Sequence, residues 1–472
     1  MIPLASFLQD PDFINVLYIV SFGLFIYGLL GLTGPRTAVR GNRIAAVGMG
    51  IALLATFLFE GMGNWGLIVF GLVVGTIVGV PAARQVKMTA VPQMVALFNG
   101  VGGGAVALIA WAEFNESGGY DGYELTFVIP SLFAAIVGSV SFWGSNIAFG
   151  KLQEILPGHP ISAGKAQQPI NLLLFVGAVA AAAGIASGET SGVYMAVVLI
   201  CSALLGLFVV LPIGGADMPV VISLLNAFTG LSAAATGLAL ENTSLIVAGM
   251  IVGASGTILT RLMADAMNRS IPSIIAGGFG GGGQIEGAAG AGDHAGTVRS
   301  TSAADVAIQL AYARQVVIVP GYGMAVAQAQ HVVREMASEL EKRGVQVKYA
   351  IHPVAGRMPG HMNVLLAEAD VPYDQLKEMD EINPEFARTD VAVVIGANDV
   401  TNPAAHTNPA SPIYGMPILT VNDAQSVIVL KRSMNPGFAG IENELYYDPK
   451  TAMLFGDAKS SVGEVTRELS VL

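Results

Sequence analysis

Nine apolar runs of membrane-spanning length lie in the first 270 residues of this 472-residue chain, and they constrain its fold more than any other feature. The runs cover about 13–32, 43–59, 65–82, 91–112, 124–149, 169–187, 192–212, 218–240 and 242–264. A transmembrane helix needs roughly 20 apolar residues, because the hydrocarbon core of a bilayer is about 30 Å thick. The sequence therefore predicts a membrane α-helical bundle of about nine transmembrane helices over residues 1–270.

Glycine is frequent within these runs. Gly71 and Gly75 are four residues apart, and residues 100–104 are almost all glycine. Small residues let helix backbones approach closely inside a membrane. Both segments therefore predict tight packing between helices.

Charged residues are sorted between the two sides of a nine-helix arrangement. All Lys and Arg residues up to position 270 fall on one side: Arg36, Arg40, Arg43, Arg84, Lys87, Lys151, Lys165, Arg261 and Arg269. The loops of the other side carry Glu60, Glu113, Glu116, Asp121, Glu124, Glu189 and Glu241. By the positive-inside rule, we expect the C-terminal domain to be cytoplasmic, or in the matrix if the source is an organelle, and the N-terminus to lie outside. We therefore expect an integral protein of the bacterial inner (plasma) membrane, in contact with membrane lipid.

Composition excludes several other kinds of partner and site. The net charge of −11 argues against a nucleic acid partner. Cys201 is the single cysteine, so neither a disulfide nor a cysteine metal site is possible within one chain. We predict no metal site.

Polar side chains inside the predicted spans are scarce, so each is a functional candidate. Asp217 lies at the start of a span and suits either a helix N-cap or a functional group, and the two roles are compatible. Asn226 lies about 13 Å further along the same helix, and Asn99 is expected at a similar depth on another helix. The two amides form either hydrogen bonds between helices or a polar, wet path that leads inward from Asp217. No histidine lies within any predicted span.

Residues 315–327, Gln-Val-Val-Ile-Val-Pro-Gly-Tyr-Gly-Met-Ala-Val-Ala, have the pattern of a buried strand, a glycine turn and the start of a helix. Such a turn presents backbone N–H groups and the positive end of a helix to a pyrophosphate. Val326 stands where the usual dinucleotide pattern has a small residue. An amphipathic helix is predicted over 326–342. A Gly/Ala-rich linker over 271–302 separates this domain, at 303–472, from the membrane block.

Further short apolar runs predict a soluble α/β, Rossmann-like, doubly wound parallel-sheet domain of about six strands. Strands are expected at 345–351, 391–395 and 426–430, with weaker candidates at 417–421 and 452–455. Ligands of such folds bind outside the carboxyl ends of the strands. The candidate cofactor-binding residues therefore follow strands: Gly321, Tyr322, Gly323, Met324, Ala325, Val326, Val354, Ala355, Gly356, Arg357, Gly396, Ala397, Asn398, Asp399, Lys431, Arg432, Ser433, Gly456, Asp457 and Ala458.

Two of these strand ends favour NADP(H) over NAD(H). The second strand ends at Ile351-His352-Pro353, without the acid that binds a ribose 2′-hydroxyl. A later strand ends in Lys431-Arg432-Ser433, which suits either a 2′-phosphate or an ordinary solvated strand end. Asp399 is the best titratable candidate at this edge, and an Asx turn is the structural alternative.

Five segments together resemble the β-subunit family of the proton-translocating NAD(P) transhydrogenases, over essentially the whole chain. They are Gly-Gly-Ala-Asp-Met-Pro at 214–219, Pro-Gly-Tyr-Gly-Met-Ala-Val-Ala at 320–327, His-Pro-Val-Ala-Gly-Arg-Met-Pro-Gly-His-Met-Asn at 352–363, Gly-Ala-Asn-Asp at 396–399 and Lys-Arg-Ser-Met-Asn at 431–435. The resemblance implies an oxidoreductase of the Si-specific (Re/Si) type. A separate α subunit holds NAD(H), and the enzyme is a dimer of αβ units. Hydride passes directly between the two nicotinamides and is coupled to proton translocation.

The resemblance also implies roles for single residues. NADP(H) lies reversed relative to ordinary dinucleotide folds, with Lys431, Arg432 and Ser433 on its 2′-phosphate and Asp399 near the nicotinamide. Asp217 and Asn226 match positions tied to proton transfer.

The chain departs from the family pattern at Asn99, where some members carry a histidine. Asparagine does not titrate, so a histidine of the partner subunit or water held by Asn99 and Asn226 must carry the proton. Two alternatives remain on the residues alone: a nucleotide-gated membrane transporter or channel with an NADP(H)-sensing domain, and an NADPH-dependent membrane reductase.

Overall fold

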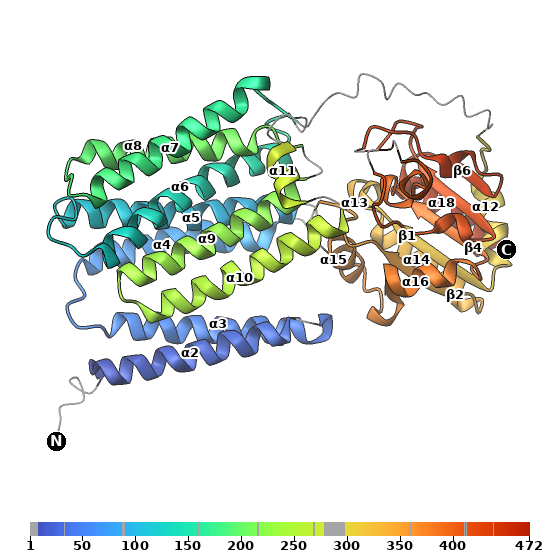
Figure 1. The fold of residues 1–472 in the computed structure, drawn as a ribbon. Helices are drawn as coiled ribbons and strands as arrows, with labels where there is room; N and C mark the ends of the chain where they lie inside the picture. The colour runs from blue at the N-terminus through green and yellow to red at the C-terminus, as the bar shows by residue number, and fades with distance from the viewer. Residues whose placement is uncertain are drawn as a thin grey trace. The chain divides into compact units, whose positions relative to one another are not determined.

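The computed structural model describes residues 8–32, 34–86, 90–157, 160–214, 217–267, 270–277, 298–357, 360–409, 411, 413–437 and 439–472. The chain forms two compact units. The first is a bundle of long helices, and the second is built around a β-sheet that comes later in the chain (Figure 1).

Nine helices in the described part of the chain are long and apolar enough to cross a membrane. They are α2 (Pro11–Gly31), α3 (Pro35–Phe57), α4 (Trp65–Gln85), α5 (Val91–Glu116), α6 (Leu125–Leu152), α7 (Gln167–Ala186), α8 (Gly192–Val210), α9 (Met218–Ala239) and α10 (Thr243–Ala266). Each coincides with one of the predicted spans. The predicted membrane bundle is therefore confirmed.

Glycine pairs bring several of these helices into backbone contact. A Cβ atom at Gly103 on α5 would lie 2.9 Å from the carbonyl oxygen of Gly138 on α6. A Cβ atom at Gly249 on α10 would lie 2.6 Å from the carbonyl oxygen of Gly230 on α9. The expected tight packing is thus found for the 100–104 segment. It is not found on α4, where Cβ atoms at Gly71 and Gly75 would meet no described atom within 4 Å.

The second unit contains a six-stranded sheet in the order β3-β2-β1-β4-β5-β6, and every neighbouring pair is parallel. Its strands are β1 (Gln315–Pro320), β2 (Gln346–Ile351), β3 (Leu376–Glu378), β4 (Val391–Ile395), β5 (Ser426–Lys431) and β6 (Thr451–Phe455). This is the strand order of a doubly wound dinucleotide-binding fold. The predicted fold class of the soluble domain is confirmed.

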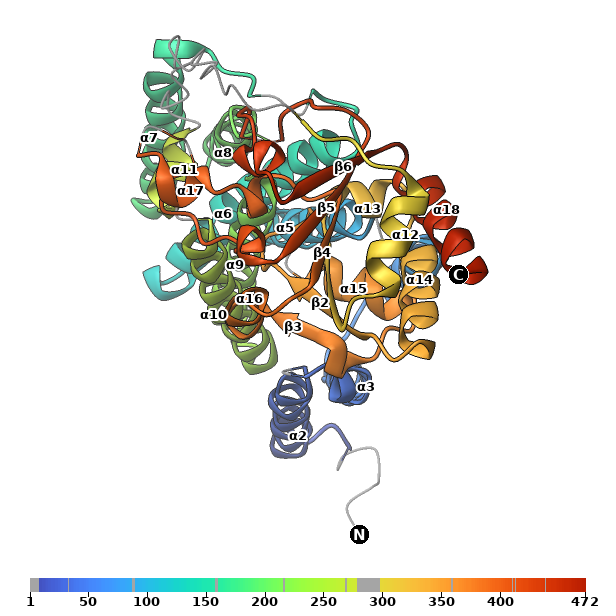
Figure 2. The ribbon, with the colours of Figure 1, turned by 90° about the vertical axis from the view of Figure 1, so that its right-hand side faces the viewer.

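Both faces of the sheet are covered, as Figure 2 shows. Along β1, Val316 and Ile318 join one core, and Val317 and Val319 join the other. The first core is formed with α12 (Ala303–Ala311), α14 (Gln330–Lys342), α15 (His361–Glu368) and α18 (Ala458–Val471). The second core is formed mainly with α16 (Met379–Phe386) and with the 3-10 turns η5 (Val421–Asp423) and η6 (Glu444–Tyr447). Central strands that are buried on both faces read as continuous apolar runs, which is why the sequence revealed them.

Two local predictions for the second unit were wrong, the strand at 417–421 and the single helix at 326–342. Residues 417–420 form no strand, and Val421 begins the turn η5. The sixth strand is instead β3, a three-residue edge strand too short and polar to give a periodic signal. The helix predicted over 326–342 is two helices, α13 (Tyr322–Val326) and α14, which are separated at Gln328, where φ is +51°. The start of the predicted linker is the helix α11 (Ile271–Gly277), and its part at 278–297 lies outside the described residues.

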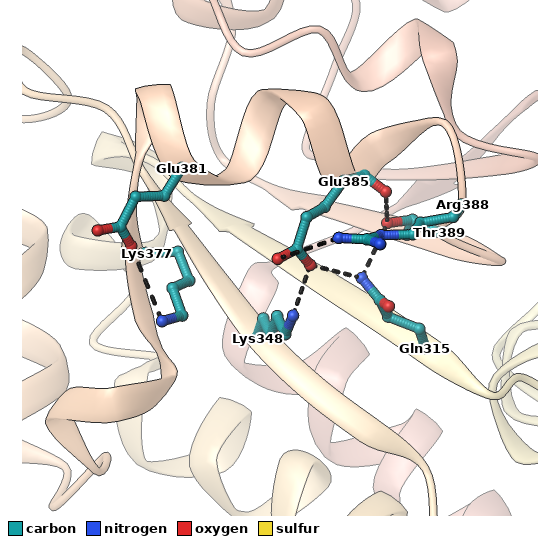
Figure 3. Close-up of polar contacts among 7 residues, drawn as sticks. All are labelled: Gln315, Lys348, Lys377, Glu381, Glu385, Arg388 and Thr389. Atoms are coloured by element: carbon teal, nitrogen blue, oxygen red, sulfur yellow. Dashed lines mark hydrogen bonds and ion pairs between the residues drawn. The ribbon is translucent and has the colours of Figure 1, made fainter.

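A polar cluster fixes α16 to the sheet beside the first residue of β1 (Figure 3). The carboxylate of Glu385 on α16 accepts from Lys348 of β2 and, at 3.1 Å, from the side-chain amide of Gln315, the first residue of β1. Thr389 donates to the Glu385 carbonyl at 3.0 Å. These contacts hold the base of the domain and leave the opposite edge of the sheet for a ligand.

Candidate functional site

The turns after β1 and β4 lie side by side at the carboxyl edge, where the strand order reverses. β1 has β2 on one side and β4 on the other, so the chain leaves the centre of the sheet in opposite directions. Ligands of open α/β sheets bind at this switch point. The cleft there brings together many of the predicted residues: Gly321, Tyr322, Gly323, Val354, Ala355, Gly356, Gly396, Ala397, Asn398, Asp399 and Lys431.

Glycines allow these two turns to touch through their backbones. A Cβ atom at Gly321 would lie 2.3 Å from the Ala397 nitrogen, and one at Gly396 would lie 2.4 Å from the Gly323 Cα. The N–H of Gly321 donates to the Ile395 carbonyl at 2.9 Å, and that of Gly323 donates to the Gly396 carbonyl at 3.0 Å. Sequence reasoning assigned these N–H groups to a pyrophosphate. In the structure they join the β1 turn to the β4 turn instead.

The remaining residues of the β1 turn differ in exposure. Met324 and Ala325 are fully buried, so their side chains belong to the core. Val326 is exposed at the end of the five-residue helix α13. Only the backbone of Met324 and Ala325 is therefore available to a cofactor.

Asp399 contacts the loop that follows β5. Its Oδ2 accepts the N–H of Ala439 at 3.0 Å, and a Cβ atom at Gly437 would lie 2.5 Å from its Oδ1. The neighbouring Asn398 contacts the Tyr446 hydroxyl at 2.8 Å. With its amide turned so that both ends are satisfied, Asn398 also accepts the N–H of Gly437 at 2.6 Å. The β5 loop thus folds over the β4 turn.

The three residues predicted to act together after β5, Lys431, Arg432 and Ser433, do not face the same way. Lys431 Nζ lies 4.9 Å from the centre of the Tyr446 ring and donates to the Asn435 carbonyl. Burial lowers the pKa of Lys431, and the negative charge of Asp399 acts in the opposite direction. Arg432 and Ser433 are exposed. Lys431 therefore faces its own loop, while the other two residues face outward.

The turn after β2 is held by two buried histidines to which sequence reasoning gave no role. His352 Nδ1 accepts the N–H of Val354 at 3.2 Å, and its Nε2 lies 2.8 Å from the Pro417 carbonyl. Burial lowers the pKa of His352 to about 4, so the ring is neutral and donates from Nε2. His361 Nδ1 accepts the N–H of Arg357 at 3.0 Å. The guanidinium of Arg357 in turn lies 4.7 Å from the centre of the Tyr322 ring.

Residues after β6 have a structural role in the described part of the chain. Asp457 caps α18, because its carboxylate accepts the N–H groups of Lys459 at 3.1 Å and Ser460 at 3.2 Å. Gly456 donates to the Lys431 carbonyl at 3.1 Å, which links the ends of β5 and β6. Ala458 is buried in the core. These three residues stay cofactor-binding predictions, and they do not line the cleft.

In the membrane unit, Asn99 joins a polar cluster between α5, α6 and α9. Its Nδ2 donates to Ser145 at 2.9 Å and to Ser141 at 3.4 Å. Ser141 lies 2.6 Å from the Thr229 hydroxyl and donates to the Leu225 carbonyl at 3.0 Å. Asn99 therefore lies beside the turn of α9 that contains Asn226. The side chain of Asn226 makes no hydrogen bond with the described residues.

Two charged residues stand near the ends of these helices. Asp217 immediately precedes α9, which has Pro219 in its first turn, as expected for a helix start. Lys151, in the last turn of α6, is only 3% exposed. Its ammonium donates to the Ile213 carbonyl at 2.7 Å and to the Leu211 carbonyl. Sequence reasoning counted Lys151 as a loop residue, because nothing in the sequence signals that a terminal lysine turns inward.

The fold and the cleft define an integral membrane protein with a Rossmann-like domain. A family model described as NAD(P) transhydrogenase beta subunit matches residues 14–468, and the chain belongs to that family. A curated relative named NAD(P) transhydrogenase subunit beta, from Rhodospirillum rubrum, is 49% identical over 459 residues, 96% of this chain and 98% of the relative. A second, from a named strain of the same species, matches equally. The family makes the chain one subunit of an oxidoreductase that also has an alpha subunit.

Proposed function

We propose that this chain binds NADP(H) at the switch-point cleft and couples hydride transfer between NADH and NADP⁺ to proton translocation across the membrane. The chemistry of two strand ends, taken together, carries the choice of cofactor. The β2 turn, which binds the adenine ribose in ordinary dinucleotide folds, offers His352 and Pro353 where NAD-binding folds place an acid. The β5 end of the same edge supplies the cations Lys431 and Arg432 and the hydroxyl of Ser433.

The residues at the carboxyl edge fit such a cofactor. Gly321, Gly323 and Gly396 carry no side chain, so the cleft wall at these three positions is backbone that a flat ligand can approach closely. Arg432 and Ser433 are exposed, and a guanidinium beside a hydroxyl is a strong donor pair for a phosphate. We assign the 2′-phosphate to Lys431, Arg432 and Ser433, and the nicotinamide end to the Asp399 side of the cleft.

When bound, the nicotinamide supplies the hydride chemistry, and this chain binds, orients and shields it from water. Tyr322 lines the cleft, and the guanidinium of Arg357 lies 4.7 Å from the centre of its ring. The β5 loop, held to Asp399 through Ala439, covers another part. Asp399 thereby connects the cofactor to the conformation of a loop, which is the kind of link that coupling to proton movement requires.

We assign proton transfer to the membrane unit. Asp217 stands at the start of α9, and Asn99 donates to Ser141, which in turn donates to the Leu225 carbonyl in the turn of α9 that contains Asn226. Asn99 cannot titrate, so on this proposal water in the polar cluster, or a group of the alpha subunit, carries the proton. We further propose that the C-terminal domain is cytoplasmic, that the membrane is the bacterial inner membrane, and that the alpha subunit holds NAD(H) in a dimer of alpha–beta units.

The test is hydride transfer by inverted vesicles that contain this chain, with and without its alpha subunit. We expect reduction of an NADP⁺ analogue by NADH only when both subunits are present. The same vesicles change their internal pH during the reaction, and an uncoupler abolishes that change while it alters the rate. Hydride transfer with no pH change would refute the coupling, and ion flux gated by NADPH without hydride transfer would support a transporter instead.

A further inference from the structure

His361 occupies an unusual position beside the cleft. It is the first residue of α15 and is fully buried. Its Nδ1 accepts the Arg357 N–H at 3.0 Å, so in the neutral ring the proton lies on Nε2. Nε2 has no hydrogen-bond partner among the described residues. A leucine would fill this space without leaving a buried donor unsatisfied, so the ring is retained for what Nδ1 does.

The β2 turn is shaped around this ring. Gly356 has φ of +108°, and a Cβ atom there would lie 2.3 Å from His361 Nδ1. Any side chain at Gly356 would therefore displace the imidazole, in addition to the strain of a positive φ. The next residue, Arg357, gives its N–H to the same nitrogen. The ring thus fixes the backbone of the β2 turn at two successive residues.

This fixed backbone directs the Arg357 side chain across to the β1 turn. The guanidinium lies 4.7 Å from the centre of the Tyr322 ring, and the Tyr322 and His361 rings are 6.4 Å apart at an angle of 50°. Tyr322 lies between the two glycines that touch the β4 turn. His361 is therefore linked through Arg357 to Tyr322, in the glycine turn at the centre of the cleft.

The protonation state of His361 suits this role. Burial, together with the positive charge of Arg357, lowers the pKa of His361 to about 4. The imidazole is therefore neutral under cellular conditions, and Nδ1 remains an acceptor. Protonation would replace the acceptor by a donor that faces the Arg357 N–H.

We infer that His361 is a positioning residue for NADP(H): by accepting the Arg357 N–H it places Arg357 and Tyr322 against the cofactor. The inference rests on the proposed function, because it assumes that the cleft binds NADP(H). It predicts that only the acceptor at Nδ1 is needed, so an amide oxygen at this position suffices.

The test compares His361→Leu with His361→Gln in the complete alpha–beta complex, with NADPH as hydride donor and an NAD⁺ analogue as acceptor. The leucine removes the acceptor at similar volume, and we expect it to raise the KM for NADPH about five- to tenfold, as the loss of one hydrogen bond implies. The kcat should change less than about twofold, and the KM for the NAD⁺ analogue should not change, since a purely positional effect acts on one substrate. The glutamine should stay within about twofold of the wild type in all three values, because its amide oxygen can accept the same N–H.

An unchanged KM for NADPH in His361→Leu would overturn the inference. Equal increases in the leucine and glutamine variants would also overturn it, as would a parallel loss of affinity for both nucleotides, which marks general misfolding. If the wild-type complex itself shows no saturation with NADPH, the proposed function fails. This outcome concerns the wild type and is therefore distinct from the outcomes for the His361 variants. His361→Asn, whose amide oxygen is bonded at the same carbon as Nδ1, provides a second amide with the same expected retention. Should the leucine variant not assemble, His361→Met provides a second variant without the acceptor, and the same rise in the KM for NADPH is expected.

Discussion

Single side chains hold the turns of the cleft in place, and the buried His352 is the clearest case. It accepts from Val354 through Nδ1 and donates to the Pro417 carbonyl through Nε2, so both ring nitrogens are used only when the ring is neutral. Pro417 precedes the turn η5, whose residues pack under the sheet. One imidazole therefore ties the β2 turn to the opposite layer of the domain.

This bond network makes the stability of the domain depend on pH. Burial lowers the pKa of His352 to about 4 from an ordinary 6.5. Between these values the unfolded chain binds a proton that the folded chain excludes. The stabilisation is complete above about pH 6.5 and is lost as pH falls toward 4, with a slope of about 1.4 kcal/mol per pH unit.

We predict that His352→Gln flattens the fall of the melting temperature between pH 7 and pH 5. The measurement is the thermal unfolding of the purified protein across this range, for wild type and variant. Since other groups titrate alike in both proteins, the difference between the two curves reports His352. Parallel curves would contradict the assignment.

Among the elements, α6 carries several polar side chains that contact other helices. Ser141 and Ser145 bind Asn99 of α5, and Lys151 in its last turn binds carbonyl groups that follow α8. A buried ammonium near the end of a helix stabilises the negative end of the helix dipole. Lys151 therefore fixes the segment that leads from α8 to Asp217 and α9.

We predict that Lys151→Met loosens this segment. The substitution keeps about the length of the side chain and removes the cation from the carbonyls of Leu211 and Ile213. The Leu211 carbonyl keeps the N–H of Ile161 at 3.1 Å, so the cost of about 1–3 kcal/mol for an unsatisfied group falls on the Ile213 carbonyl. Hydrogen–deuterium exchange of peptides over 205–225 should become faster, while Lys165→Met, which removes an exposed lysine, should leave it unchanged. Unchanged exchange in Lys151→Met would show that the ammonium does not hold the segment.

Elements also show why some predictions succeeded. The spans and the central strands were predictable, because hydrophobic burial leaves long apolar runs in the sequence. β3 consists only of Leu376, Lys377 and Glu378, so it leaves no apolar run in the sequence. The break between α13 and α14 depends on the left-handed Gln328, a conformation that the helical periodicity of the surrounding residues conceals.

At the scale of the whole molecule, the position of the cleft followed from one topological rule, that parallel strands present their carboxyl ends at one edge. The rule correctly placed Gly321, Gly396 and Lys431 together. It did not foresee the contact between the two glycine turns or the fold of the β5 loop onto Asp399, because both depend on contacts between residues far apart in the sequence. The roles of His361 and Lys151 were missed for the same reason.

The central claim is that this cleft selects NADP(H), and isothermal titration of the purified chain with NADPH and with NADH tests it most directly. Charged hydrogen bonds to the 2′-phosphate are worth about 1.5–3 kcal/mol each. We therefore predict that NADPH binds at least about tenfold more tightly than NADH, and that Arg432→Ala reduces this ratio without weakening NADH. Equal affinities for the two nucleotides, or tighter binding of NADH, would contradict the account.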